Sequence, residues 1–471
     1  MKKRALSFLL TAAMVLSLNT LVFAEETKTT SVRPDSEIAV QLDGEYIIFP
    51  DSQPEFKDNL TYMPLRAFLE ALGAEVSYSN ATGIVTASKG DLKVESRIGS
   101  TKAMITENGA SRSVETTSAP YISSGRTMVP ARYASEIFGL GYDNLNKTVV
   151  IIDTAKITDS LTDSFTLVDK YMTFANNVAG DNSSVDGTLN LSITDKMSDE
   201  ASTIKAAGTI NGLVSKTKSD MSIAIDFDEA SLKEALGEES EDITAIKAVL
   251  DNLKMNLAMD MKEGSYYYQY PSIAPLMGYS PETWFKLDMN QLFAESGIPL
   301  SLESLLSLNE SGLKNVLGTV LAYQTPSSIN DYGEMLKAMA LVEDMLGDSA
   351  FKKVGDNYVS TYKTTLEGAD IELSIKLLMD GASINGYDIS AYVKDGSSSV
   401  SVVSKLDSKL NATVSMNFTL ENMFEMAFGM DVKYSPTTQS PLGAPAEGSK
   451  IVDLSSLLFN GTIPQPETGE M

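Results

Sequence analysis

The sequence predicts an α+β protein with two dissimilar parts. A phrase occurs twice in the first part, as "NLTYMPLRAFLEALGAEVSYSN" from Asn59 and as "GRTMVPARYASEIFGLGYDN" from Gly125. After residue 184, apolar and polar residues alternate with a period of two, which is typical of strands that bury one face. We therefore expect a duplicated helix-strand-strand N-terminal domain, followed by a larger antiparallel β-sheet domain with packed helices.

The two copies share six residues at an offset of 66 positions. These residues are Thr61, Pro64, Arg66, Glu70, Gly73 and Asn80 in the first copy, and Thr127, Pro130, Arg132, Glu136, Gly139 and Asn146 in the second. Proline suits the start of a helix, where its missing N–H is not needed, and glycine favours the left-handed conformation that ends one. Each copy predicts a short helix, a strand, a polar turn and a second strand. One such unit is too small to bury its own apolar face, but two together can.

The arginines of the repeat precede glutamates by four positions, which is the weaker order for an ion pair along a helix. We therefore expect Arg66 and Arg132 to reach out of their helices, each to a carbonyl or carboxylate of a neighbouring strand. This structural role is favoured over an anion site, because one Arg per copy forms no cluster.

Residues 1–24 have the features of a secretory signal peptide. Lys2, Lys3 and Arg4 precede a mostly apolar run, and small residues end at Ala24. The apolar run is short for a transmembrane anchor, which is the alternative interpretation. Cleavage after Ala24 would give a secreted protein that is extracellular or associated with the cell wall.

The composition narrows the classes of function. The chain has 37 Lys and Arg against 63 Asp and Glu, with neither His nor Cys. The acidity argues against a basic nucleic-acid surface and is most simply a solvated surface. Without imidazole or thiolate groups, the common copper and zinc sites and the Ser-His and Cys-His nucleophiles are excluded. We expect no catalytic residues, metal or cofactor, although a hydrolase that uses carboxylates alone stays open.

The second part combines predicted strands with amphipathic helical segments. The helical segments are 230–254, 301–323 and 329–347, and we expect them on the apolar face of one long sheet. A low-polarity wall for a ligand is a further hypothesis, with Met255, Leu257, Met259, Met261 and Trp284 as its residues. Methionine adapts to varied acyl chains, but ordinary core packing is the simpler interpretation. Tyr266, Tyr267, Tyr268 and Tyr270 cannot all share a surface, because neighbours along a strand face opposite ways.

The frame "L-T-Y-M-P-L-R-x-x-x-E" and its partner "G-R-T-M-V-P-A-R-x-x-x-E" resemble the copper amine oxidase N-terminal-like (stalk) domain. This domain occurs on exported proteins of Gram-positive bacteria, and the resemblance spans about residues 38 to 153. It implies a scaffold for attachment. The oxidase reaction of that family belongs to a different domain, whose copper-binding histidines have no counterpart in this chain.

The cadence of strands and aromatic residues around 255–288 resembles envelope proteins of the LolA and LppX-like type. In those proteins a curved sheet half-wraps helices and encloses lipid. The resemblance covers about residues 185 to 435 and implies that the larger antiparallel sheet is curved.

The predicted organisation has six segments. They are a signal peptide at 1–24, a linker at 25–35, the stalk domain at 36–155, a helical connector at 156–184, the β-rich domain at 185–435, and a tail at 436–471 that is mostly disordered outside 451–459. We expect an exported, non-enzymatic cell-envelope protein with a stalk-like module for attachment to a surface or partner and a β-rich binding domain. The alternative is an extracellular carrier of lipid or another apolar ligand. Neither nucleic acid nor integral membrane insertion is expected.

Overall fold

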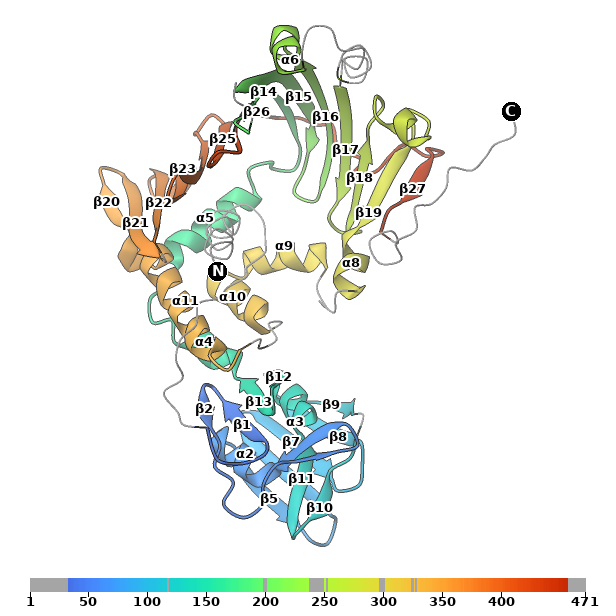
Figure 1. The fold of residues 1–471 in the computed structure, drawn as a ribbon, viewed down its shortest axis with the longest axis vertical. Coiled ribbons are helices and arrows are strands. Elements are labelled where there is room, and N and C mark those ends of the chain that lie inside the picture. Colours follow the sequence, from blue (N-terminus) through green and yellow to red (C-terminus); the bar gives the residue numbers. More distant parts are fainter. Residues whose placement is uncertain are drawn as a thin grey trace. The chain divides into compact units, whose positions relative to one another are not determined.

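The computed structural model describes most of the chain and divides it into two compact units (Figure 1). The described residues are 33–116, 118–197, 201–236, 250, 253–295, 301–322, 326, 328–366 and 368–455. The predicted signal peptide, most of the linker and the tail from residue 456 lie outside them. The first unit contains residues 33–162 and 317–343, and the second contains residues 163–316 and 344–455.

The first unit is built from three small sheets and short helices. Its strands are β1 (Ala39–Leu42), β2 (Glu45–Tyr46), β3 (Glu55–Lys57), β4 (Leu60–Pro64), β5 (Glu75–Ser79), β6 (Ile84–Lys89), β7 (Leu92–Arg97), β8 (Lys102–Glu107), β9 (Ala110–Glu115), β10 (Tyr121–Ser123), β11 (Arg126–Pro130), β12 (Gly141–Leu145) and β13 (Thr148–Ile152). Its helices are α2 (Leu65–Ala71), α3 (Ala131–Phe138), α4 (Thr154–Asp159) and parts of α10 (Leu313–Ala322) and α11 (Asp331–Leu346). The sheet orders are β12-β13-β1-β2, β10-β11-β4-β3 and β5-β6-β7-β8-β9.

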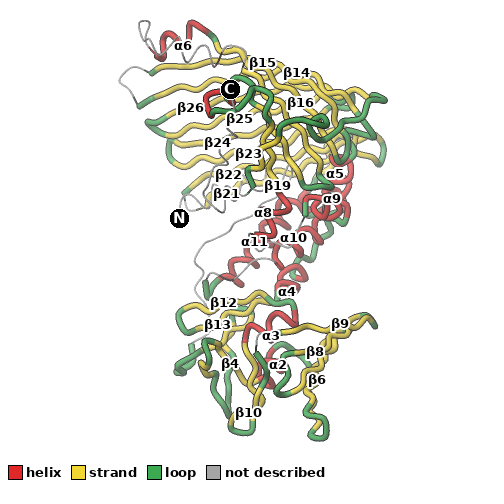
Figure 2. The backbone as a smooth tube through the Cα atoms, turned by 90° about the vertical axis from the view of Figure 1, so that its right-hand side faces the viewer, coloured by secondary structure: helices red, strands yellow, loops and turns green. Residues whose placement is uncertain are grey.

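The repeated phrase forms the same elements twice, as β4-α2-β5-β6 and β11-α3-β12-β13 (Figures 1 and 2). β4 and β11 are antiparallel neighbours with Met63 opposite Val129, so the two copies pair directly with one another. Gly73 and Gly139 have φ values of 79° and 66°, the left-handed conformation expected at a helix end. The helix-strand-strand prediction is confirmed. The repeat did not reveal β7, β8 and β9, which lie between the copies and extend the β5-β6 pair.

The second unit has one large sheet. Its strands are β14 (Ser183–Asp195), β15 (Ser202–Val214), β16 (Lys218–Phe227), β17 (Leu253–Asp260), β18 (Ser265–Gln269), β19 (Trp284–Asp288), β20 (Lys352–Val354), β21 (Asn357–Leu366), β22 (Ala369–Asp380), β23 (Ser383–Asp395), β24 (Ser398–Leu406), β25 (Asn411–Leu420), β26 (Phe424–Pro436) and β27 (Ile451–Asp453). Their order is β20-β21-β22-β23-β24-β25-β26-β14-β15-β16-β17-β18-β19-β27, and among these described strands β19 and β27 form the one parallel pair. The unit also contains α5 (Thr166–Asn176), α6 (Glu229–Leu236), α8 (Met289–Glu295) and α9 (Leu302–Glu310).

The large sheet is strongly curved, and α5 lies on its concave side (Figure 1). The ring of Tyr171 on α5 meets the ring of Tyr387 on β23 edge to face, with centroids 5.3 Å apart. Phe174 on α5 packs against a core cluster that includes Val185 and Leu189 of β14. The curved antiparallel sheet with a packed helix is therefore confirmed. The expectation for the segment 329–347 is wrong in part, because residues 331–343 of α11 belong to the first unit.

The start of α5 is capped by a carboxylate distant in sequence. Asp348 accepts hydrogen bonds from the Ser164 hydroxyl at 2.7 Å and from the backbone N–H groups of Thr166 at 3.1 Å and Leu167 at 2.9 Å. Partial burial alone would raise the pKa of Asp348, but these hydrogen bonds lower it below its ordinary value. The ionised carboxylate thus replaces the local capping residue that Phe165 does not provide.

Replacing Asp348 by Ala should lower the free energy of unfolding by about 1–2 kcal/mol at pH 7, the usual value of a helix cap. A carboxylate whose pKa falls on folding stabilises the protein above its unfolded pKa of about 3.9, and the stabilisation is lost as the pH drops through the folded pKa. Urea unfolding at pH 7 and pH 3 should therefore show a smaller difference between variant and parent at pH 3. Asp344→Ala, at an exposed position of α11, is the control. An equal loss at both pH values would contradict the assignment.

Candidate functional site

The concave face of the large sheet carries no charge over much of its width. Residues that are directly opposite one another on neighbouring strands point to the same face of a sheet. The strand register therefore identifies a row of residues that share one face across six strands. This row is Val185, Gly212, Met221, Leu257, Tyr268 and Phe285. Within the described strands β15–β18 and β24–β26, the residues on this face include no Lys, Arg, Asp or Glu.

The helices cover this face unevenly. Near α5 several inward residues are fully buried, such as Val185 at 3% exposure and Leu406 at 2%, whereas Tyr387 is partly buried. Along β16 and β17, in contrast, the inward side chains are only half-buried. We call the inward residues of β16, β17 and the β18 segment the apolar wall: Met221, Ile223, Ile225, Leu253, Met255, Leu257, Met259, Tyr266, Tyr268 and Tyr270.

Three tyrosines form a stack at one end of the apolar wall. The rings of Tyr266 and Tyr268 have centroids 6.5 Å apart with planes at 12°, and those of Tyr268 and Tyr270 are 6.4 Å apart at 1°. Burial raises the pKa of all three hydroxyls, so they stay neutral. Tyr267 is buried on the opposite face. The expected alternation of these tyrosines is observed.

The structure brings together only part of the predicted low-polarity wall. Met255, Leu257 and Met259 share the concave face, and Met261 lies in the turn after β17. Trp284 is wrongly included, because it pairs with Gln269 and so lies on the convex face. Sequence reasoning missed the three tyrosines as members of the wall, although period-two alternation places them on one face.

The two repeat arginines lie on outward helix faces. Arg66 and Arg132 are exposed, as are Glu70 and Glu136. Among the described residues neither Arg hydrogen-bonds a carbonyl or carboxylate, so that expectation is wrong. Arg132 instead places its guanidinium carbon 5.5 Å from the ring centroid of Tyr142. The apolar stripe of each helix points into the core and leaves the Arg on the other side.

Arg132→Ala should therefore cost about 0.5–1 kcal/mol, the value of an exposed cation–π contact. Arg66→Ala should change the free energy of unfolding by less than about 0.5 kcal/mol, as for most surface substitutions. Thermal melting of both variants beside the parent measures the difference. A loss of several degrees for Arg66→Ala alone would show a structural contact that this arrangement does not contain.

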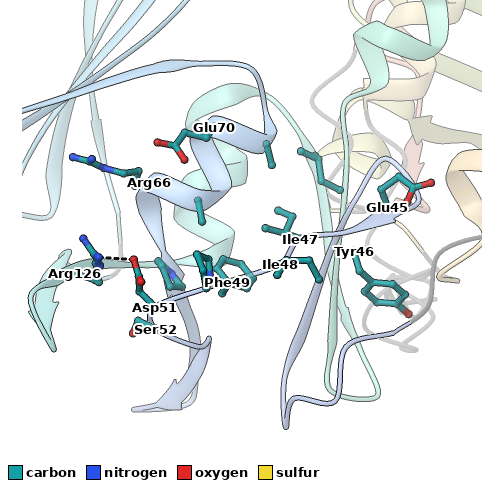
Figure 3. Close-up of a pocket in the computed structure, with 15 residues that line it drawn as sticks. Glu45, Tyr46, Ile47, Ile48, Phe49, Asp51, Ser52, Arg66, Glu70 and Arg126 are labelled. Carbon is teal, nitrogen blue, oxygen red and sulfur yellow. Dashed lines mark hydrogen bonds and ion pairs between the residues drawn. The ribbon is translucent and has the colours of Figure 1, made fainter.

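A pocket of about 450 Å³ lies beside α2 in the first unit (Figure 3). Arg66 and Glu70 of α2 line one end together with Arg126 of β11, which forms an ion pair with Asp51. The segment that follows β2 supplies apolar residues in the middle, including the 68% exposed Ile48, and Glu45 and Tyr46 of β2 line the other end. Three of the repeat residues, Pro64, Arg66 and Glu70, thus border a cavity.

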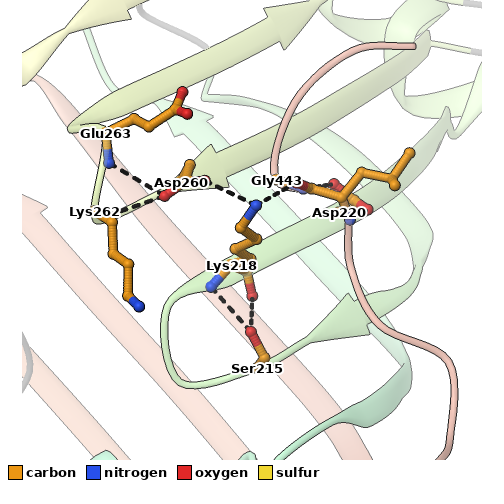
Figure 4. Close-up of polar contacts among 8 residues, drawn as sticks. Ser215, Lys218, Asp220, Asp260, Lys262, Glu263 and Gly443 are labelled. Atoms are coloured by element: carbon orange, nitrogen blue, oxygen red, sulfur yellow. Dashed lines mark hydrogen bonds and ion pairs between the residues drawn. The ribbon is translucent and has the colours of Figure 1, made fainter.

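A polar cluster fixes the chain after β26 against the large sheet (Figure 4). The Asp220 carboxylate accepts the backbone N–H groups of Leu442 at 2.6 Å and Gly443 at 2.9 Å, and Lys218 donates to the Leu442 carbonyl at 3.1 Å. The Lys218 ammonium nitrogen also lies 3.0 Å from a carboxylate oxygen of Asp260. Burial alone would raise the pKa of Asp260, but the contact with Lys218 helps to hold this pKa below its ordinary value.

The prediction of a mostly disordered tail is thus wrong for residues 437–450. The Pro- and Gly-rich composition of this segment indicates that it cannot form a core of its own. Composition gives no information on whether the backbone of the segment hydrogen-bonds to another part of the chain. β27 then pairs with the edge strand β19.

Residues 41–152 match the family model of the copper amine oxidase N-terminal domain. The match confirms the resemblance inferred from the repeated phrase. The matched domain is the N-terminal, non-catalytic one of that family. Within the first unit, residues 41–152 are therefore similar to this class of domain.

Two solved structures are similar to this chain. One is a DUF1329 family protein from Desulfovibrio piger ATCC 29098, and the other is a putative outer membrane lipoprotein-sorting protein domain from Vibrio parahaemolyticus. Both are 8% identical with TM-scores of 0.21; they cover 59% and 57% of this chain, and 96% and 93% of their own. At this TM-score the two structures carry no argument about this chain. No curated protein matches the chain. None of the described helices is both long and apolar enough to cross a bilayer.

Proposed function

We propose that this chain is an exported, non-enzymatic cell-envelope protein whose C-terminal sheet binds an apolar ligand such as a lipid acyl chain. Its N-terminal stalk-like domain would attach it to a cell-wall component, another surface component or a partner. The supporting observation is the apolar wall, which is free of charge and only half-buried along β16 and β17.

The physical basis is the area that a ligand could remove from water. Covering apolar surface yields about 25 cal/mol per Å², and a methionine-rich wall can adjust to chains of different shape. Charged groups on the same face would oppose such a ligand through their desolvation cost, and the sequence places them on the convex face instead. Lys254 of β17, for example, is exposed there, one position after Leu253 of the wall.

The absence of an enzymatic role rests on the chain's chemistry. Imidazole and thiolate groups are missing from the whole sequence, and the family match covers a non-catalytic domain. A hydrolase with a carboxylate pair would need two such groups about 5 to 9 Å apart in a cleft. Activity of the purified chain on a panel of glycosides would overturn the non-enzymatic assignment.

The ligand is testable by native mass spectrometry of the full chain purified without detergent from cells that make it. We expect a fraction of the protein to carry added mass, and organic extraction should release an acyl-containing molecule. A carrier should also hand this molecule to acceptor vesicles, whereas a stationary binding protein should keep it. Unliganded protein in repeated preparations would contradict ligand binding.

Export is tested separately by cell fractionation. The features of residues 1–24 predict recovery from the medium or the cell wall, with a mass that corresponds to cleavage after Ala24. Recovery of the intact chain from the cytoplasm alone would contradict the proposed location. The domain boundaries at 36–155 and 185–435 remain predictions, and limited proteolysis of the exported protein would test them.

A further inference from the structure

The pocket beside α2 combines charged and apolar lining residues. Figure 3 shows Arg66, Glu70, Arg126 and Asp51 gathered at one end, Ile48 and its neighbours in the middle, and Tyr46 and Glu45 at the other end. Its volume of about 450 Å³ lies in the range of small-molecule sites, about 300–1,000 Å³. An isoleucine that is 68% exposed at the rim leaves apolar surface for a ligand to cover.

The repeat itself explains why this pocket exists beside α2. At the offset of 66 residues, Ala67 and Ala71 of α2 correspond to Tyr133 and Ile137 of α3. Both larger side chains are buried, at 4% and 3% exposure, and the Tyr133 hydroxyl bonds Ser96 at 2.7 Å. The first copy thus has two small residues that line a cavity where the second has large residues packed in the interior.

Among the described residues, the repeat also leaves one of its two arginines without a hydrogen bond, ion pair or ring contact. Arg132 lies over the ring of Tyr142, but the residue that corresponds to Tyr142 in the first copy is Val76. Arg66 accordingly has no ring or carboxylate contact among the described residues. Arg126 is already paired with Asp51, so Arg66 is the cation of the pocket that can accept an anionic group.

From these features we propose that the pocket beside α2 binds a short peptide that ends in a free carboxylate and an apolar side chain. The planar guanidinium of Arg66 matches the two oxygens of a carboxylate. Ile48 offers the surface for the apolar side chain, and Glu70 can accept a peptide N–H or ammonium group. This inference rests on the attachment role proposed for the stalk-like domain, and it names the kind of ligand that the domain would bind.

The surrounding charges select against other anions. A phosphate carries more negative charge than a carboxylate and would be repelled more strongly by Glu70 and Glu45, which also line the pocket. A fatty acid would use Arg66 and the apolar residues of the pocket but leave Glu70 without a donor. All the arginines of the chain lie at or before Arg132, so bidentate recognition of carboxylates by Arg is confined to the N-terminal part.

The test is calorimetric titration of the full chain with Ala-Ala-Xaa tripeptides, where Xaa is Ala, Leu or Phe. Each peptide is used as the free acid and as the C-terminal amide, and decanoate and inorganic phosphate are included as alternatives. We expect the Leu or Phe free acid to bind, and its amide to bind at least about tenfold more weakly, as for loss of a charge-assisted contact. Such a peptide could belong to a cell wall or be free in solution. Titration with a cross-linked cell-wall peptide and with a soluble peptide that has the same C-terminal residue distinguishes these two sources.

Matched variants come from the repeat. Arg66→Ala should weaken binding by at least about tenfold, and Ala67→Tyr, which copies the second repeat, should abolish it by filling the pocket. Arg132→Ala should bind like the parent, and unchanged melting of Arg66→Ala and Ala67→Tyr shows that they fold. Absence of binding by every tripeptide, equal binding of acid and amide, or tighter binding of decanoate would overturn the proposal. The titration uses purified protein and needs no cell surface. Its result is therefore independent of whether the protein is exported and whether it binds lipid.

Discussion

Replacing Phe68 by Ala is expected to lower the free energy of unfolding of the first unit by about 3–5 kcal/mol, the cost of truncating a buried Phe. Phe68 lies on the inward stripe of α2 and has 0% exposure. Its core cluster contains Met63 of the first copy and Val129 of the second. A cavity at this position would therefore weaken both copies at once, since neither can bury its apolar face alone.

The measurement is differential scanning calorimetry of the full chain, in which the first unit should unfold at a clearly lower temperature. Phe56→Ala provides the control, because Phe56 on the edge strand β3 is 64% exposed. Its removal should change the free energy by less than about 0.5 kcal/mol. If both variants lowered the free energy of unfolding by similar amounts, burial of Phe68 on α2 would not be an important contribution to the stability of the core.

The helices and strands of the repeat in the first unit were predictable because the repeated phrase contains the residues that begin and end each helix. Gly73 and Gly139 take the left-handed conformation that their positions require. The side on which Arg66 and Arg132 lie was not predictable from the i,i+4 spacing, which does not report what lies beside each helix. Only tertiary structure shows that Tyr142 lies beside Arg132 and that a cavity borders Arg66.

The large sheet was predictable in its alternation but not in its register. Alternation placed Met255 and Leu257 on one face, but whether Trp284 shares that face depends on how β18 pairs with β19. The placement of α11 and of residues 437–450 also depends on long-range contacts. Aspartates such as Asp220 and Asp348 hold distant backbone N–H groups, and local sequence carries no signal of such partners.

Curvature, in contrast, has a sequence signal that becomes clear with the structure. Gly208 and Gly212 lie on the concave face of β15, and a Cβ atom built on them would be 2.2 Å from the Ala224 carbonyl oxygen and 2.1 Å from that of Asp220. The neighbouring strand β16 approaches so closely that only glycine fits. Glycines at inward positions of a long strand therefore mark where the sheet bends around its concave face.

Leu257→Asp is expected to reduce copurification of the apolar ligand by more than tenfold. Leu257 is central in the apolar wall, between Met221 and Tyr268 in the same row. The variant loses the contact of one leucine, worth about 1.5–3 kcal/mol when fully buried, and a ligand would also have to desolvate a new carboxylate. Since about 1.4 kcal/mol corresponds to a tenfold change, these two effects together exceed that factor. Native mass spectrometry and lipid extraction measure the bound fraction.

Lys254→Asp is the matched control, because it introduces the same residue into the same strand at an exposed position of the opposite face. It should retain the ligand fully. Leu257 is only half-buried, so the Asp variant should still fold, and near-parental melting of both variants would show it. Equal loss of ligand in both variants would show that the ligand is held elsewhere or by net charge. Full retention in Leu257→Asp would exclude the concave face as the binding surface, since no acyl chain lying against this row could avoid the new carboxylate.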